Sequence, residues 1–192
     1  MAPLNFDAAH FDALYRDNAD PWDFRTSAYE RAKYAATVQA LPLGRYRHLL
    51  ELGCSIGELT ALLAPCADRL TAVETSAVAL DIARARCAAY PHVHFVQAHL
   101  PGGPWEAAYD AVVLSEVLYY LTLPAIDELA DRLQRCAPQA DLILVHWTGM
   151  TNYPLSGDAA AEGFRSRVPS AHWTCRRTPY YRCDVLPRAS TP

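Results

Sequence analysis

Lysine is almost missing from this sequence: Lys33 is the single lysine among 17 basic residues, and no run of basic residues occurs. The 21 acidic residues leave a net charge of −4. Because nucleic-acid binding depends on clustered basic residues that neutralise phosphates, this composition argues against it. Long apolar stretches are missing too: none approaches a membrane span, and the residues after Met1 lack the apolar centre of a signal peptide. We therefore expect a soluble, cytoplasmic protein that binds neither nucleic acid nor membrane.

Closely spaced cysteine pairs are also absent. None of the six cysteines belongs to a C-x-x-C motif or lies at zinc-binding spacing from a histidine. They lie mostly in apolar segments, where a free cysteine behaves as a small hydrophobic residue. His92 and His94 alternate on one predicted strand, but no third ligand accompanies them, so surface positions are favoured over a metal pair. We predict reduced cysteines and no metal site.

The length and composition indicate one domain. A chain of 192 residues buries roughly two-thirds of its unfolded surface, and 52% of these residues are hydrophobic. No internal repeat or low-complexity segment divides the chain. We predict a single domain over residues 1–192, with an N-terminal helical lid at 1–44 and an α/β core at 45–192, as a monomer or homodimer.

One segment organises the rest of the sequence. Residues 49–52 form a short apolar run without alternation, which is typical of a buried parallel strand. Gly53 and Gly57 interrupt the run, helical spacing follows, and a second apolar run ends at Glu74. This order of strand, glycine turn, helix, strand and acid is found where an adenosine-containing cofactor binds at the carboxyl edge of a parallel sheet. A plain βαβ unit with a tight turn is the alternative.

The glycine spacing and Glu51 discriminate between cofactors. A dinucleotide site requires G-x-G-x-x-G, because the pyrophosphate lies against bare backbone, whereas here three residues separate Gly53 from Gly57. Glu51 would repel a phosphate and attract an ammonium or sulfonium group. S-adenosylmethionine (SAM) carries both cations, and Glu74 would accept hydrogen bonds from its ribose hydroxyls. We therefore predict SAM as the cofactor.

Alternating helix and strand patterns continue along the chain. Besides the segments above, we predict helices at 5–17, 28–40, 77–89, 124–137 and 157–167, strands at 92–97, 109–115 and 141–147, and a terminal antiparallel hairpin of 172–178 and 180–186. Ser27 and Glu30 fit a capping box. Five β/α units closed by a hairpin correspond, by analogy, to the Rossmann-like seven-stranded α/β fold of SAM-dependent methyltransferases.

Polar residues follow the two strands expected at the sheet centre. Ser115 and Glu116 lie at the end of one strand, and His146 lies near the end of the other. Ligands bind beyond such strand ends in open α/β sheets, so Glu116 and His146 are candidate general bases. Tyr119 and Tyr120 would shape the acceptor pocket. Two alternatives stay open: His146 bonded to loop backbone, and Tyr120 packed in the core.

The N-terminal region places Lys33 on one helix face with Tyr29, four residues earlier. Trp22 lies in a turn ahead of that helix. One interpretation is a helical layer whose Lys33 is solvated. The other is a lid over the cofactor, with Lys33 aimed at a carboxylate.

Motifs along nearly the whole chain resemble a known family. The segments 51–57 (ELGCSIG) and 115–120 (SEVLYY), with Glu74, resemble class I methyltransferase motifs. The segments 20–24 (DPWDF) and 27–34 (SAYERAKY), with 146–147 (HW) and 153–157 (YPLSG), are similar to the nodulation protein S (NodS-like) family. The resemblance implies SAM-dependent methyl transfer. The namesake N-methylates the free amine of a deacetylated chitooligosaccharide, so a small-molecule or saccharide acceptor is implied here.

The resemblance also implies roles for individual residues. The turn from Gly53 to Gly57, which includes Cys54, would surround the methionine part of SAM, with Tyr29 and Lys33 at its carboxylate. Trp22 would belong to the lid.

At the nucleoside end, Glu74 and Thr75 would bind the ribose. After the third strand, where an Asp commonly accepts from the adenine amine, this sequence has His99 followed by Leu100. A neutral imidazole accepts less strongly than a carboxylate, so backbone groups around residues 98–100 would replace it.

We therefore predict a SAM-dependent methyltransferase that N-methylates an amine on a small molecule or saccharide. An O-methyltransferase for another metabolite is the alternative within the same chemistry. A SAM-binding module without catalysis would not need the polar strand ends at Ser115, Glu116 and His146. A nicotinamide oxidoreductase would need the missing G-x-G-x-x-G.

Overall fold

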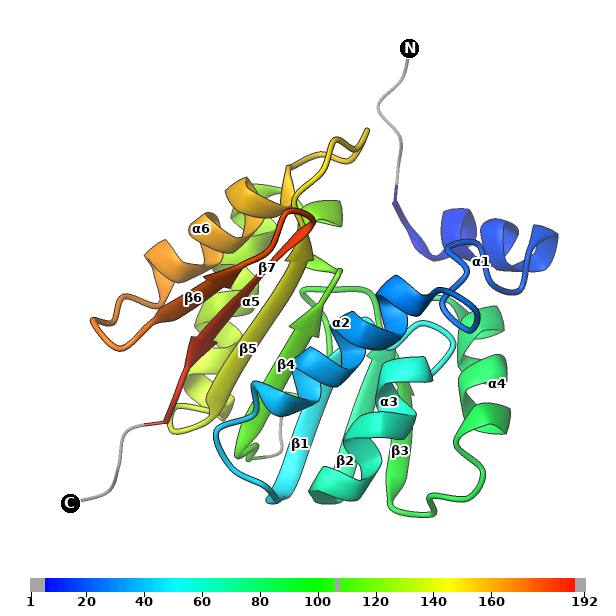
Figure 1. Ribbon diagram of the computed structural model, residues 1–192, viewed down its shortest axis with the longest axis horizontal. Coiled ribbons are helices and arrows are strands. Elements are labelled where there is room, and N and C mark those ends of the chain that lie inside the picture. The colour runs from blue at the N-terminus through cyan, green and yellow to red at the C-terminus, as the bar shows by residue number, and fades with distance from the viewer. Residues whose placement is uncertain (1–5, 106–107, 189–192) are drawn as a thin grey trace.

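A seven-stranded sheet forms the centre of the molecule (Figure 1). The structure is a computed structural model that describes residues 6–105 and 108–188. The strand order is β3-β2-β1-β4-β5-β7-β6, in which the first five strands are parallel and β7 is antiparallel to both β5 and β6. The strands are β1 (Tyr46–Leu52), β2 (Ala67–Glu74), β3 (Val93–Gln97), β4 (Ala111–Ser115), β5 (Asp141–Trp147), β6 (Thr174–Arg177) and β7 (Tyr181–Leu186).

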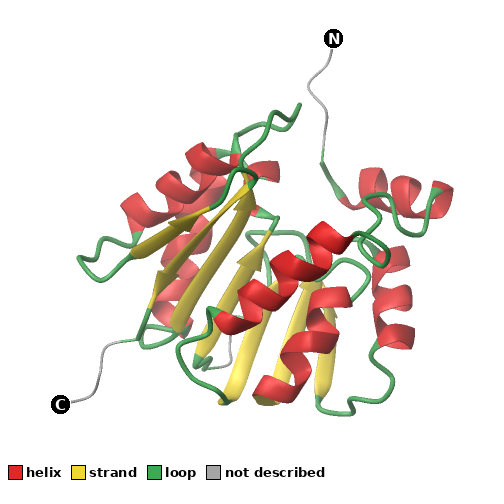
Figure 2. Cartoon of the chain, in the orientation of Figure 1, coloured by secondary structure: helices red, strands yellow, loops and turns green. Residues whose placement is uncertain are grey.

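Helices cover both faces of this sheet (Figure 2). One face packs against α2, α3 and α4 and the other against α5 and α6, while α1 packs on α4. The helices are α1 (Ala8–Asp17), α2 (Ala28–Gln39), α3 (Glu58–Leu63), α4 (Ala77–Arg86), α5 (Leu123–Cys136) and α6 (Gly157–Arg167), with short 3₁₀ turns η1 (Ala64–Cys66) and η2 (Leu118–Tyr120).

The central strand explains why the apolar runs lack alternation. In β4, Val112 and Leu114 contact the cluster that includes Phe164, whereas Val113 contacts the cluster on the opposite face that includes Leu59. All three β4 side chains are fully buried. Because helices cover both faces, each residue of a parallel strand meets apolar neighbours.

The predicted order of elements is confirmed, and the differences are local. β5 and α6 have the predicted bounds, and the terminal hairpin lies at the sheet edge with β7 against β5. α4 ends at Arg86 instead of 89, because residues 87–90 close a turn in which Tyr90 N donates to Cys87 O. Ser27 caps α2, but Glu30 does not complete the capping box: Ser27 N donates to Asp23 O instead.

The topology fixes where a ligand can bind. β2 lies on one side of β1 and β4 on the other, so the crossover direction reverses between β1 and β4. In open α/β sheets this reversal opens a crevice beyond the carboxyl ends of the strands. The tips of β1, β2 and β4 therefore carry the side chains that meet a ligand.

Candidate active site

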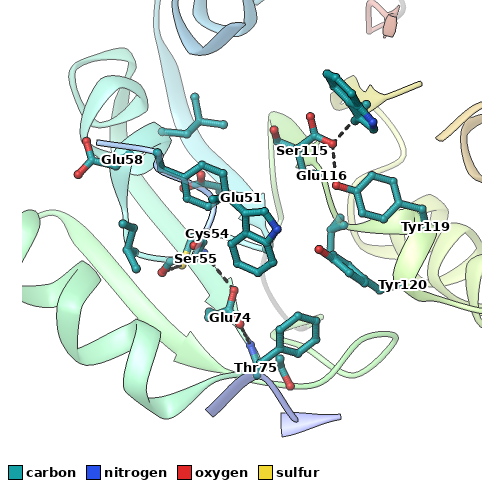
Figure 3. Close-up of a pocket in the computed structure, with 18 of the residues that line it drawn as sticks. Glu51, Cys54, Ser55, Glu58, Glu74, Thr75, Ser115, Glu116, Tyr119 and Tyr120 are labelled. Atoms are coloured by element: carbon teal, nitrogen blue, oxygen red, sulfur yellow. Dashed lines mark hydrogen bonds between the residues drawn. The ribbon is translucent and has the colours of Figure 1, made fainter. Parts of the chain in front are cut away.

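A pocket of about 410 Å³ lies beyond these strand tips (Figure 3), and residues of α1 and α2 contribute to its lining. Most of the predicted site residues line it: Trp22, Tyr29, Lys33, Glu51, Gly53, Cys54, Glu74, Thr75, His99, Leu100, Ser115, Glu116 and Tyr119. Gly57 and His146 do not. The sheet edge thus brings together side chains that are far apart in the sequence.

The glycine turn lets the backbone pass close to the β4 tip. Gly53 has a φ of +81°, and a Cβ at this position would lie 2.9 Å from the Cβ of Val117. Gly57 has a φ of +84°, but its Cβ would meet the backbone of Ala83 in α4 at 3.0 Å. The prediction that Gly57 surrounds the cofactor is therefore corrected: this glycine permits α3 to start close to α4.

Glu74 is held at the end of β2 by backbone donors. One carboxylate oxygen accepts from Thr75 N at 2.8 Å and Ser76 N at 2.9 Å, and the other accepts from Ser55 N at 3.0 Å. Burial raises the pKa of Glu74, and the three N–H groups oppose that rise. A carboxylate has about four acceptor positions, so Glu74 can accept a further hydrogen bond from a ligand hydroxyl.

Glu51 is buried at the end of β1 with an incomplete set of partners. Its side chain is 1% exposed, and Oε2 has no hydrogen-bond partner among the described residues. Burial, with a smaller contribution from nearby Glu74, raises the pKa of Glu51 to about 7. An unpaired buried carboxylate is costly, so this position fits a cationic group of a ligand.

Glu116 lies on the opposite side of the pocket from Glu74 (Figure 3). Its φ of +56° is unusual for a residue other than glycine and directs the side chain back from the β4 tip toward the cleft. Its Oε1 accepts from Lys33 Nζ at 2.6 Å, and its Oε2 accepts from Tyr119 Oη at 2.7 Å and Trp147 N at 2.8 Å. Donors from three elements therefore fix this carboxylate.

Lys33 is buried, so the interpretation with a solvated Lys33 is wrong; its ammonium is aimed at carboxylates, and these belong to the chain itself. Its side chain is 3% exposed, and Nζ lies 3.0 Å from both oxygens of Glu30 in addition to its contact with Glu116. The ammonium lies over the ring of Tyr29, 5.2 Å from its centroid. α2 is thereby joined to the tip of β4.

His146 lies outside the pocket, and its predicted role as a base is corrected. The imidazole is fully buried, and Nε2 accepts from Leu118 N at 3.3 Å. Burial lowers the pKa of His146 to about 4, so the ring stays neutral and keeps this acceptor. The alternative of a strand-end residue bonded to loop backbone is the one the structure shows.

Two residues near the β2 and β3 tips contact each other. Thr75 Oγ1 lies 3.1 Å from Nδ1 of His99, and the neighbouring Leu100 is buried. The hydrogen-bonding capacity of the imidazole is thus partly used within the chain.

An aromatic wall lines the pocket on the Glu116 side; Tyr119 and Tyr120 were predicted from the sequence, whereas Phe6 and Tyr153 were not assigned to the pocket. Tyr119 stacks on Tyr153 with 5.0 Å between ring centroids, and Tyr120 lies 4.5 Å from the same ring and 5.4 Å from Phe6. Tyr120 lines the cavity, so it is more than a core residue. Phe6 carries no recognisable motif, and only the resemblance to the family pointed to the segment containing Tyr153.

Metal ligands, cysteines and helix hydrophobicity complete the description of residues 6–105 and 108–188. No three His, Cys, Asp or Glu side chains there are grouped as a metal site would require. The six cysteines are free. None of the helices described combines the length and apolar character needed to cross a bilayer.

The sheet order and the crevice beyond β1, β2 and β4 place the protein in the Rossmann-like fold class of SAM-dependent methyltransferases. A candidate methyltransferase from Pseudomonas syringae is 35% identical, with a TM-score of 0.74 over 84% of this chain and 100% of that chain. The N-methyltransferase NodS from Bradyrhizobium japonicum WM9, in complex with S-adenosyl-L-homocysteine (SAH), is 19% identical, with a TM-score of 0.79 over 93% and 97%.

Within this class the chain belongs to the Nodulation protein S (NodS) family, whose sequence model matches residues 8–135. Nodulation protein S of Bradyrhizobium diazoefficiens is 35% identical over 103 residues, which are 53% of this chain and 49% of that protein. The relative from Rhizobium tropici is 34% identical over 115 residues, 58% and 48% of the two chains. The chain thus spans about half the length of the curated relatives it matches, and the predicted family resemblance is confirmed.

Proposed function

We propose that this protein is a SAM-dependent methyltransferase that N-methylates an amine on a small molecule or saccharide. The observation that carries the proposal is the buried, incompletely paired Glu51 beside Glu74 at the next strand tip, in one pocket. A cofactor with a cationic end and a ribose diol satisfies both carboxylates. Membership of the NodS family and the likeness in fold to an N-methyltransferase that binds SAH support the same chemistry.

The residues at the β1 and β2 tips fit the two ends of SAM. Glu51 would bind the amino group and Glu74 the ribose hydroxyls, while Gly53 permits close approach of the backbone. When bound, SAM supplies an electrophilic methyl group on a sulfonium. Residues 6–44 would act as the lid, since Trp22 and Tyr29 line the pocket and would exclude water; residues 1–5 of the predicted lid lie outside the described residues.

The acceptor would lie between the aromatic wall and Glu116. Alignment of an amine with the methyl donor supplies about 7–11 kcal/mol of the barrier. Glu116 would anchor the amine and take its proton, which adds about 10²–10⁴-fold to the rate. Tyr119 would keep that carboxylate in position through its 2.7 Å hydrogen bond.

The test is mass spectrometry of products from SAM and a panel of amino sugars and small amines, combined with calorimetry of SAH binding. Glu116→Gln should slow turnover more than it weakens SAH binding, and Glu128→Gln on the exposed face of α5 serves as the control. Equal turnover in Glu116→Gln would remove Glu116 from the mechanism. Stabilisation by NAD and not by SAH in a thermal-shift assay would replace the proposal with oxidoreductase chemistry.

A cytoplasmic location is part of the proposal and is supported by the six free cysteines, since a reducing compartment keeps thiols unpaired.

A further inference from the structure

The acceptor end of the pocket contains a second carboxylate, Glu30, that sequence motifs assigned to helix capping. Its carboxylate turns away from the helix terminus and pairs with Lys33, whose Nζ lies 3.0 Å from both Glu30 oxygens and 2.6 Å from Glu116 Oε1. All three side chains line the pocket and are at most 14% exposed. We refer to Glu30, Lys33 and Glu116 as the acceptor triad.

The acceptor triad carries one negative charge in excess, since two carboxylates share one ammonium. The other donors to Glu116 are the Tyr119 hydroxyl and the Trp147 backbone N–H, both neutral. Across residues 6–105 and 108–188, Lys33 is the single cation within ion-pair distance of either carboxylate. A buried charge without a counterion is costly, so the triad is incomplete without a cation.

One carboxylate oxygen of the triad can accept from that cation. Both oxygens of Glu30 lie 3.0 Å from Lys33 Nζ and are already ion-paired, whereas Glu116 contacts that ammonium through Oε1. Both residues line the pocket. Glu116 Oε1 accepts from Lys33 alone, whereas Oε2 already accepts twice, so Oε1 keeps an acceptor position for a ligand N–H.

We infer that the acceptor triad works as one charge-balancing unit that selects a cationic amine as the methyl acceptor, with Glu30 as a specificity-determining residue. This inference rests on the proposed function. The triad is neutralised when an ammonium binds, which favours such acceptors over neutral hydroxyl compounds and disfavours acceptors with a carboxylate or phosphate next to the nitrogen.

The excess negative charge of the acceptor triad also favours the methyl-transfer step. The ammonium gives one proton to Glu116 Oε1 and keeps the nitrogen electron pair. That pair forms the new N–C bond while the C–S bond breaks and leaves its electrons on sulfur. Lys33 keeps the two carboxylates from repelling each other, so a proton arriving at Glu116 takes the triad from one negative charge to none.

A charge series tests the inference. Glu30→Gln makes the triad neutral, Lys33→Met makes it doubly negative, and the double variant restores the single negative charge with different side chains. Calorimetry on the SAH-loaded protein would compare D-glucosamine with D-glucose, and phenethylamine with 2-phenylethanol. The SAH affinity and the unfolding temperature of each variant establish that it is folded and that its donor site is intact.

We expect at least one amine to bind wild type tenfold or more tightly than its hydroxyl counterpart. Glu30→Gln should lose that preference, and the double variant should regain most of it, a coupling that separate structural roles would not produce. Equal binding of amines and alcohols by wild type would overturn the inference, as would failure of the double variant to recover. Absence of SAH binding in wild type would instead refute the proposed function.

Discussion

Replacement of Glu51 by glutamine should make the ligand-free protein more stable while weakening its hold on the cofactor. Burial gives this carboxyl a pKa of about 7 in the folded protein, against 4.5 as its ordinary value. Keeping it ionised at pH 8 therefore costs about 3 kcal/mol of folding free energy. The side chain is almost completely buried, so solvent does not screen this cost.

The sign of the effect follows from which state releases the proton first. As pH rises from 4.5 toward 7, the unfolded chain loses the Glu51 proton while the folded protein retains it, so wild-type stability falls through this window. Glu51→Gln has no such proton and should lack this part of the decline. At pH 8 its unfolding midpoint should be higher by about 6–12 °C, since 1 kcal/mol corresponds to about 2–4 °C in a chain of this size.

Binding should change in the opposite direction. Loss of a charged hydrogen bond worth about 1.5–3 kcal/mol should weaken SAH binding by about 10–100-fold at pH 8. The SAH affinity of wild type should also fall below pH 7 as Glu51 becomes protonated, and that of the variant should depend less on pH. Thermal unfolding and calorimetry at pH 5, 6.5 and 8 measure both effects, with Glu128→Gln as the surface control. A variant no more stable than wild type at pH 8, or one with unchanged SAH affinity, would refute this reasoning.

Three further substitutions separate cofactor binding, positioning and stability. Glu74→Ala should abolish SAH binding and also lower stability by about 1–3 kcal/mol for each of three unpaired backbone N–H groups; calorimetry and urea unfolding test both, and unchanged stability would contradict it. In His146→Gln the amide oxygen can accept from Leu118 N in place of the imidazole. The pH dependence of the rate near neutral pH should therefore stay as in wild type, and a change there would restore His146 as a base. Arg182→Met should cost about 3–5 kcal/mol in urea unfolding, because the buried Asp184 then keeps Arg165 alone as a cationic partner among the described residues. SAH affinity should persist, and a sharp loss would connect this cluster to the site.

The sequence predicted the site residues correctly where polar side chains lie at the ends of parallel strands. The βαβ order alone predicts that Glu51, Gly53 and Glu74 lie close together, because they are at the ends of two consecutive parallel strands. Glu116 could be predicted in the same way, since it directly follows the most apolar strand. In each case the position relative to a strand end determines where the side chain lies.

The remaining parts depend on distances that sequence spacing does not encode. Lys33 and Glu116 are 83 residues apart and meet only because α2 crosses the sheet above β4. Gly57 fits the glycine motif, and His146 lies near a strand end. In the structure, however, Gly57 packs closely against α4, and His146 accepts a hydrogen bond from a buried backbone N–H. Glu30 matched a capping pattern, but the nearby ammonium of Lys33 binds its carboxylate instead.

The place of β7 in the sheet has a consequence for biosynthesis. This strand follows β6 in the chain but lies between β5 and β6, and it carries the buried Arg182. Until residues 181–186 leave the ribosome, β5 has an open edge and the acidic residues Asp158 and Glu162 on α6 lack their contacts with Arg182. Domains generally fold as units during translation. The β4–β7 half of the sheet, which holds the acceptor side of the pocket, is thus completed after the β1–β3 half. A chain that terminates before β7 exposes the unpaired edge of β5, which is prone to aggregation and is a surface that chaperones can bind.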